Sequence, residues 1–266
     1  MRQFREANKE QTELLLKEAG ISSYSLCQGL TALRKANFGE KGYYYQGFFL
    51  LSIGLERLLK LILIYKYRVE NNDKFPDNAT LKEYGHDIEK ITNLVIKGYE
   101  SKLLFRKDDE PYKSMIKLLS DFAKSTRYYN LDKLTGKANL NNDPLKEWYK
   151  IQEIIINKHP IRKRMTDKEL ELVSLMNEIS YVSYTDNNEN KINDLFKYFD
   201  QVYYCDHTQG YSVYYLCRII SSLVLILEDF EYEFLFFPFL REFFFCFKTE
   251  GISMTVIRKK KNWVVS

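Results

Sequence analysis

A small group of charged and polar side chains interrupts otherwise apolar segments, and its residue types suit proton transfer and phosphate binding. Histidine changes charge near neutral pH, so it can carry a proton, and the planar guanidinium of arginine can hold a phosphate. We expect His86 to be the proton carrier and Arg127 or Arg57 to hold the phosphate. The candidate catalytic cluster consists of Glu56, Arg57, His86, Asp87, Arg127 and Asn130.

A second interpretation of the same cluster involves no chemistry. A charge buried without a partner costs several kcal/mol, so charges on packed helices need one another. Glutamate, arginine, histidine and aspartate on neighbouring helices can therefore form an internal network that fixes how the helices align. An open cleft around these side chains favours the first interpretation, and burial favours the second.

The sequence lacks the common motifs of nucleotide and metal enzymes. It contains no GxxxxGK(S/T), GxGxxG, HExxH or GxSxG pattern. Only three histidines are present, and neighbours such as Cys205, Asp206 and His207 point in different directions on a helix. We therefore predict neither a metal site nor a cofactor.

Composition indicates a folded, helix-rich chain. In 266 residues there are only 11 glycines and 5 prolines, which favours helices over a fold with many turns. The net charge of +4 is too mild to require a nucleic-acid partner. The first residues have no apolar signal core, and the four cysteines form no CxxC pair, so we expect a cytoplasmic protein with reduced thiols.

Two short basic runs stand out from this mild charge. Arg162, Lys163 and Arg164 form one run, and residues 258–261 form the other. Such a run can bind the phosphates of a nucleic acid, or it can simply be a solvated face or tail. The run at 162–164 is the candidate nucleic-acid-binding patch.

The stretch LSIGLERLLKLILI, residues 51–64, belongs to a helix expected over about residues 42–67. Its apolar length approaches that of a membrane span, but charges at mid-bilayer are expensive. Ser52, Glu56 and Lys60 recur every four residues and so form one polar stripe on an apolar helix. This pattern favours a central helix of a bundle, without an integral membrane span.

The remaining elements are expected to be helices separated by polar loops. Gly20 and Gly210 are expected to stop helices, and Gly85 is expected to mark either a bend in a helix or a break after which Asp87 caps a new helix. The expected helices cover about residues 4–19, 22–38, 109–124, 191–208 and 211–230, with further helices starting near Thr80, Asp143 and Thr166.

The C-terminal part is the most apolar. The stretch from Phe234 to Phe247 can be core, a dimer or protein-partner face, or a membrane-surface anchor. We expect one all-α, multi-helix bundle over residues 1–248. Residues 249–266 are expected to form a basic arm, either extended or a short strand.

Three stretches together carry a family resemblance. LSIGLERLLKLILI with its aromatic lead-in, then YGHDIEKI, then RYYNLDKLTG with NNDPLKEWY resemble bacterial proteins with HEPN domains over residues 43–149. The resemblance implies a helical bundle, often a homodimer, of the kind found in RNA-cutting toxins, phage defence and antitoxin-like partners.

The chain departs from that family in its nuclease signature. The signature is an arginine followed four to six residues later by a histidine, and none of His86, His159 and His207 has such an arginine. A cleaving site has to be assembled from separate segments instead. The alternatives are RNA binding without cleavage, a non-catalytic protein-interaction module, and a peripheral membrane protein that uses the Phe-rich segment.

Overall fold

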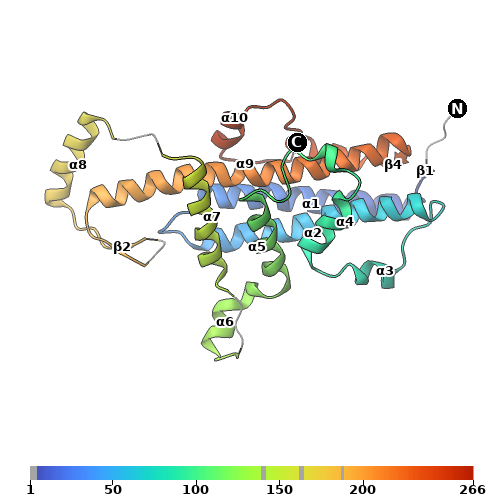
Figure 1. Ribbon diagram of the computed structural model, residues 1–266, viewed down its shortest axis with the longest axis horizontal. Coiled ribbons are helices and arrows are strands. Elements are labelled where there is room, and N and C mark those ends of the chain that lie inside the picture. Colours follow the sequence, from blue (N-terminus) through green and yellow to red (C-terminus); the bar gives the residue numbers. More distant parts are fainter. Residues whose placement is uncertain (1–4, 139–141, 162–164, 187–188, 266) are drawn as a thin grey trace.

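The chain is built almost entirely from helices, which confirms the all-α prediction. The computed structural model describes residues 5–138, 142–161, 165–186 and 189–265. Three long helices lie side by side along the long axis of the molecule (Figure 1). They are α1 (Lys9–Lys35), α2 (Gly42–Glu70) and α9 (Leu195–Glu233).

The α1–α2 pair is antiparallel and unusually close. A Cβ atom added at Gly54 would lie 2.7 Å from Cγ of Leu26, and one added at Gly29 would lie 2.7 Å from Cγ of Leu51. No side chain fits at these positions, so glycine lets the two helix backbones approach. This packing fixes the rotation of α2 and therefore the direction in which its polar stripe points.

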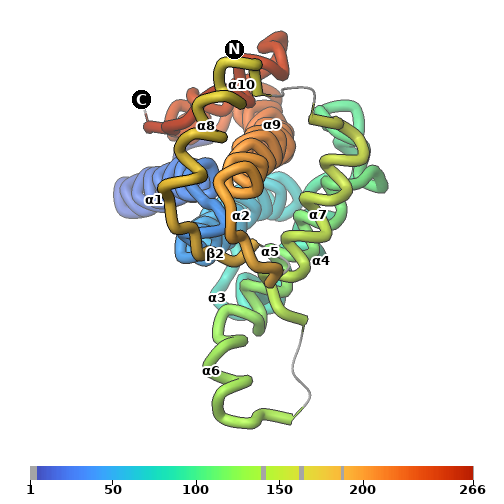
Figure 2. The backbone as a smooth tube through the Cα atoms, turned by 90° about the vertical axis from the view of Figure 1, so that its left-hand side faces the viewer, coloured from blue at the N-terminus to red at the C-terminus, as the bar shows by residue number. Residues whose placement is uncertain are grey.

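Shorter elements surround this layer of long helices. Figure 2 shows the long helices end-on, with α7 and α4 on one side of them and α6 projecting away. The shorter helices are α3 (Asn78–Glu83), α4 (Ile88–Ile96), η1 (Glu100–Lys102), α5 (Tyr112–Lys124), η2 (Thr126–Tyr128), α6 (Tyr129–Leu134), α7 (Pro144–Lys158), α8 (Asp167–Ile179), η3 (Leu240–Phe247) and α10 (Met254–Lys259).

The described strands are only two residues long. β1 (Arg5–Glu6) pairs in parallel with β4 (Phe236–Phe237), which ties the N-terminal segment to the end of α9. β2 (Tyr184–Thr185) and β3 (Lys191–Ile192) form an antiparallel pair between α8 and α9. These pairs fasten connections and do not form a sheet core.

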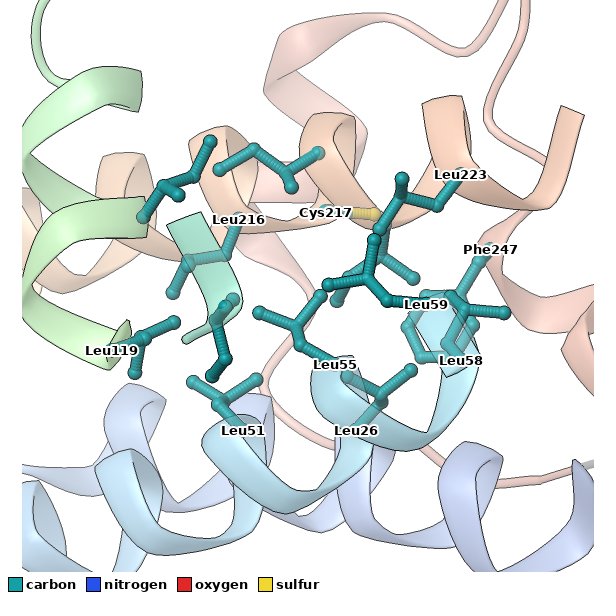
Figure 3. Close-up of a cluster of buried hydrophobic side chains, with 14 of the residues drawn as sticks. Leu26, Leu51, Leu55, Leu58, Leu59, Leu119, Leu216, Cys217, Leu223 and Phe247 are labelled. Atoms are coloured by element: carbon teal, nitrogen blue, oxygen red, sulfur yellow. The ribbon is translucent and has the colours of Figure 1, made fainter. Parts of the chain in front are cut away.

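The core lies where α1, α2 and α9 meet. Figure 3 shows leucines of α2 pointing toward leucines of α1, α5 and α9. Burying such a side chain contributes roughly 1.5–3 kcal/mol. The labelled residues are Leu26, Leu51, Leu55, Leu58, Leu59, Leu119, Leu216, Cys217, Leu223 and Phe247.

Two predicted helix breaks are wrong. Gly20 lies inside α1, and Gly210 lies inside α9, which is continuous over 39 residues. A glycine inside a helix costs only about 1 kcal/mol, which burial of the flanking apolar residues outweighs. At Gly210 an added Cβ would lie 3.0 Å from Cγ of Arg258, so this glycine makes room for α10.

Other predicted boundaries are confirmed. Gly85 has a φ of 65°, and Asp87 caps α4 by accepting from the backbone N–H of Lys90. Asp143 caps α7, with Pro144 in its first turn. Thr166 forms a capping box at the start of α8. These caps follow from side-chain oxygens that accept otherwise unpaired backbone N–H groups.

Part of the Phe-rich segment is core. Phe236, Phe244 and Phe247 are fully buried, whereas Phe237 and Phe245 are exposed. Three of the eight phenylalanines in residues 234–247 thus belong to the core, and a partner or membrane-surface role for the segment stays a prediction. Among the described helices, α9 alone is long and apolar enough to cross a membrane, and 83% of its most apolar window is buried inside the protein.

The C-terminal segment packs against the bundle. In place of the expected strand or fully extended arm, residues 254–259 form α10. The ring of Trp263 stacks on Phe247 with centroids 5.8 Å apart, and its backbone N–H donates to Thr31 Oγ1 at 2.9 Å. The indole therefore completes the core beside η3.

Candidate functional site

The structure brings four of the six predicted catalytic residues to one pocket. Its volume is about 480 Å³, and it lies between the polar stripe of α2 and segments of α1, α3, α5 and η2. We call it the α2 pocket. Its lining residues are Glu18, Phe49, Ser52, Ile53, Glu56, Arg57, Lys60, Leu61, Ile64, Leu81, His86, Phe122, Ala123 and Arg127.

A glutamate–histidine pair forms the centre of this pocket. His86 Nδ1 lies 2.9 Å from Glu56 Oε1, and Lys60 Nζ lies 2.7 Å from the same oxygen. A carboxylate only accepts hydrogen bonds, so Nδ1 of His86 must be the donor. In the neutral ring this leaves Nε2 with a free lone pair, which is the state that a general base requires.

The two members of this pair differ in exposure. The Glu56 side chain is 18% exposed and the His86 side chain is 69% exposed. The carboxylate is thus held within the protein, while the imidazole it orients reaches solvent. This arrangement resembles that of an open site more than that of an internal structural network.

The two predicted phosphate-binding arginines have different surroundings. Arg57 forms an ion pair with Glu18, which joins α2 to α1. Arg127 is exposed, lies 5.5 Å from the centroid of the Tyr128 ring, and pairs with no carboxylate among the described residues. Arg127 is therefore the better placed of the two to bind an anion that enters the pocket.

Asp87 does not line the pocket, and its side chain contacts residues of α5 instead. Its Oδ1 accepts from Ser120 Oγ at 2.9 Å, and its Oδ2 accepts from Lys124 Nζ at 2.8 Å. Partial burial opposes its ionisation, but hydrogen bonds from Lys124, the Lys90 backbone and Ser120 outweigh this and lower the pKa of Asp87 to about 2. The ionised carboxylate ties the start of α4 to α5, which places His86.

Asn130 also lies outside the pocket lining. Its side-chain N–H donates to the hydroxyl of Tyr45 at 3.1 Å, which links α6 to the start of α2. Asn130 therefore has a structural partner on α2, and no contact with the Glu56–His86 pair is present in the structure.

The stripe of Ser52, Glu56 and Lys60 now has an explanation. The hydroxyl of Ser52 donates to the carbonyl of Leu119 at 3.2 Å and so fastens α2 to α5. Ser52 also lines the pocket, together with Glu56 and Lys60 one and two turns further along. The stripe thus fastens α2 to α5 and forms one wall of the open pocket.

Sequence reasoning missed several members of the site. Glu18 was not expected because its partner Arg57 is 39 positions away, on another helix. Phe49 and Phe122 supply apolar walls, and nothing in their local sequence distinguishes them from core phenylalanines.

Other predicted functional groups are not part of this pocket. The basic run of Arg162, Lys163 and Arg164 lies outside the described residues. Within the described parts of the chain, no group of three or more His, Cys, Asp and Glu side chains is arranged to hold a metal ion.

The pocket combines the groups needed for acid–base work on an anion. Arg57, Lys60 and Arg127 carry positive charge, Glu18 and Glu56 carry negative charge, and phenylalanines form part of the wall.

No protein-family model matches the chain, and no curated protein and no solved structure is significantly similar to it. The resemblance to HEPN domains therefore stays a prediction.

Proposed function

We propose that the protein acts on RNA at the α2 pocket, as a HEPN-like ribonuclease that needs no metal ion. The observation that carries the proposal is the Glu56–His86 hydrogen bond of 2.9 Å inside an open pocket that also holds Arg127. The resemblance of residues 43–149 to HEPN domains supports it. A defence or toxin–antitoxin role follows from the same resemblance.

The pocket supplies an acid–base pathway for cleavage. His86 Nε2 takes the proton of a ribose 2′-hydroxyl, while Glu56 stabilises the resulting imidazolium through Nδ1. The 2′-oxygen attacks the adjacent phosphorus, the bond to the 5′-oxygen breaks, and that oxygen takes up a proton from solvent. Arg127 stabilises the charge on the phosphoryl oxygens. The products carry a 2′,3′-cyclic phosphate and a 5′-hydroxyl.

The apolar part of the pocket gives a reason to expect a nucleotide. Phe49 lies on its wall and is 46% exposed, and aromatic side chains stack on unpaired bases of single-stranded RNA. A volume of about 480 Å³ lies within the range of small-molecule sites, large enough for one nucleotide unit. The proposal therefore favours a loop or single strand over an RNA duplex.

The test is cleavage of labelled tRNA and total RNA in the presence of EDTA. Wild type should cleave, and Arg127→Ala should lose about 100-fold or more in rate because a charge-stabilising donor is removed. Arg106→Ala is the matched control, since Arg106 is also exposed and lies outside the pocket. Absence of cleavage by wild type, or equal rates for both variants, would contradict the proposal.

A second candidate function, self-association, rests on α8. Leu172, Leu175, Met176 and Ile179 are 42–88% exposed and follow the spacing of a helix–helix seam. α8 lies at one end of the molecule (Figure 1), where a second copy could pack antiparallel on the same face. We propose this face as the interface of a homodimer.

Light scattering tests the dimer. Wild type should have twice the chain mass, and Leu175→Glu should give a monomer because a charge would enter an apolar seam. Val256→Glu is the control, since Val256 is 61% exposed, like Leu175, but lies on α10. A monomeric wild type, or a dimer that survives Leu175→Glu, would exclude this interface.

A further inference from the structure

Two cysteines far apart in the sequence meet between α1 and η3. Sγ of Cys27 lies 3.4 Å from Sγ of Cys246. Cys27 is fully buried on α1, and Cys246 is half-buried in η3. The hydroxyl of Ser23 donates to the carbonyl of Phe243, so η3 is held against α1 on the same side as the thiol pair.

The two thiols are chemically different. The hydrogen bond with Cys27 and the charge of Lys260 lower the pKa of Cys246, although burial opposes this. The same hydrogen bond, together with burial, raises the pKa of Cys27. Of these two contacting sulfurs, that of Cys246 is therefore the more acidic, and it is also the more exposed, which suits Cys246 as the attacking cysteine and Cys27 as the resolving one.

The other two cysteines lack these features. Burial raises the pKa of Cys205 to about 11 and that of Cys217 to about 12. Cys205 lies in a separate small cluster beside Phe38, and Cys217 lies 4.0 Å from the hydroxyl of Ser221. Both thiols stay protonated near neutral pH, and protonated buried thiols react slowly with oxidants.

We propose that Cys27 and Cys246 are a redox-active pair that a peroxide converts into a disulfide. The Cys246 thiolate attacks one oxygen of hydrogen peroxide, the O–O bond breaks, and a sulfenic acid and hydroxide form. The Cys27 sulfur then attacks the Cys246 sulfur and displaces the sulfenic oxygen as water. The two thiols lose two electrons in total, and one peroxide becomes two waters.

The geometry requires only a small movement. The two sulfurs must approach from 3.4 Å to the roughly 2.05 Å of a disulfide bond. This inference does not depend on the proposed action on RNA.

The bond would connect η3 to α1 covalently. η3 supplies Phe244 and Phe247 to the core, so its detachment is a step in unfolding. The disulfide closes a loop of more than 200 residues and restricts the unfolded chain. The oxidised protein should therefore melt at a higher temperature than the reduced protein.

The experiment treats reduced full-length protein with hydrogen peroxide and counts free thiols with a maleimide under denaturing conditions. Two of the four thiols should be lost in wild type, with a mass decrease of two hydrogens and a linked peptide pair containing Cys27 and Cys246. Dithiothreitol should restore all four thiols and the lower melting temperature.

Two variants make the result specific. Cys205→Ser should still lose two thiols, whereas Cys246→Ser should keep all three of its remaining thiols. Retention of four thiols by wild type, a bond between any other pair, or addition of oxygen without a crosslink would overturn the proposal. Because Cys246 is half-buried, Cys246→Ser should fold, which a melting curve checks directly.

Discussion

The two sides of α2 show how one helix serves as scaffold and as site. Toward α1 and α9, Leu55 is 1% exposed and Gly54 lies against Leu26 without room for a side chain. Toward the α2 pocket, Glu56 and Lys60 bond to each other and His86 reaches solvent. Neighbouring residues on a helix differ by about 100° in direction, so adjacent positions have opposite roles.

The two sides of α2 should therefore contribute to different properties, the packed side to stability and the pocket side to activity. Substitutions on the packed side should lower the free energy of unfolding and reduce activity only through loss of folded protein. Substitutions on the pocket side should change activity with little effect on unfolding. The following variants test that separation from the largest expected change in stability to the smallest.

Leu55→Ala should cost about 2–5 kcal/mol in the free energy of unfolding, since it removes buried methyl groups and leaves a cavity. Urea denaturation followed by circular dichroism measures the change. Leu134→Ala is the control, because Leu134 is 82% exposed and its truncation should change stability by less than about 0.5 kcal/mol. An equal loss in the free energy of unfolding for Leu55→Ala and Leu134→Ala would contradict the burial of Leu55 in the core.

Gly54→Ala should cost about 1–3 kcal/mol because of overpacking against Leu26. The higher helix propensity of alanine returns about 1 kcal/mol, so the net loss should lie at the lower end of that range. Gly42→Ala provides the comparison, since an added Cβ there meets no atom within 4 Å. A stabilised Gly54→Ala protein would contradict the close α1–α2 approach.

A fall in pH should strengthen the stabilisation that one carboxyl group provides and weaken the stabilisation that another provides. Burial raises the pKa of Glu231 from 4.5 to about 7, against opposing hydrogen bonds and charge from Arg241 and the Leu240 backbone. Folded protein then holds a proton that the unfolded chain releases, so this group's stabilisation is full below pH 4.5 and is lost as the pH rises toward 7. Glu231→Gln should remove that decline in melting temperature between pH 4.5 and 7.

Asp87 provides the contrast on the pocket side. Its pKa is lowered from 3.8 to about 2, so its stabilisation is full above pH 3.8 and is lost as the pH falls toward 2. Asp87→Asn should make the melting temperature less dependent on pH below pH 4. Between pH 4.5 and 7 the pH dependence of the melting temperature should be the same as in wild type. If Glu231→Gln and Asp87→Asn changed the pH dependence of the melting temperature in the same way, the opposite pKa shifts of Glu231 and Asp87 would be contradicted.

Arg127→Met should give the smallest change in stability, less than about 0.5 kcal/mol, because the side chain is exposed and has no carboxylate partner among the described residues. RNA affinity should fall nevertheless. Removal of one phosphate contact should make the dependence of log K on log salt shallower by about 0.7. An unchanged slope in fluorescence anisotropy would exclude Arg127 from phosphate binding.

Much of this arrangement follows from local sequence. The four-residue spacing of Ser52, Glu56 and Lys60 predicted a polar stripe, and Asp87 was predicted as a cap. The pairing of Glu56 with His86 was a hypothesis about the cluster, and the structure brings them to 2.9 Å. The stripe and the cap depend on helix geometry and on side chains near each other in the chain, whereas Glu56 and His86 are 30 positions apart and meet only because of the packing of α2.

Features that depend on long-range packing were not accessible in this way. Gly20 and Gly210 resembled helix stops because nothing local shows that Phe243 and Arg258 pack against them. The contact between Cys27 and Cys246 spans 219 positions, and no spacing rule predicts it. Such pairs are decided by which helix faces meet, and that is a property of the whole fold.

The most direct test of the account is the chemistry of the RNA ends produced in EDTA by wild type and by His86→Ala. The account predicts 2′,3′-cyclic phosphate and 5′-hydroxyl ends for wild type, and a rate at least about 100-fold lower for His86→Ala at unchanged melting temperature. Ends of another type, or equal cleavage by both proteins, would contradict a role for the Glu56–His86 pair.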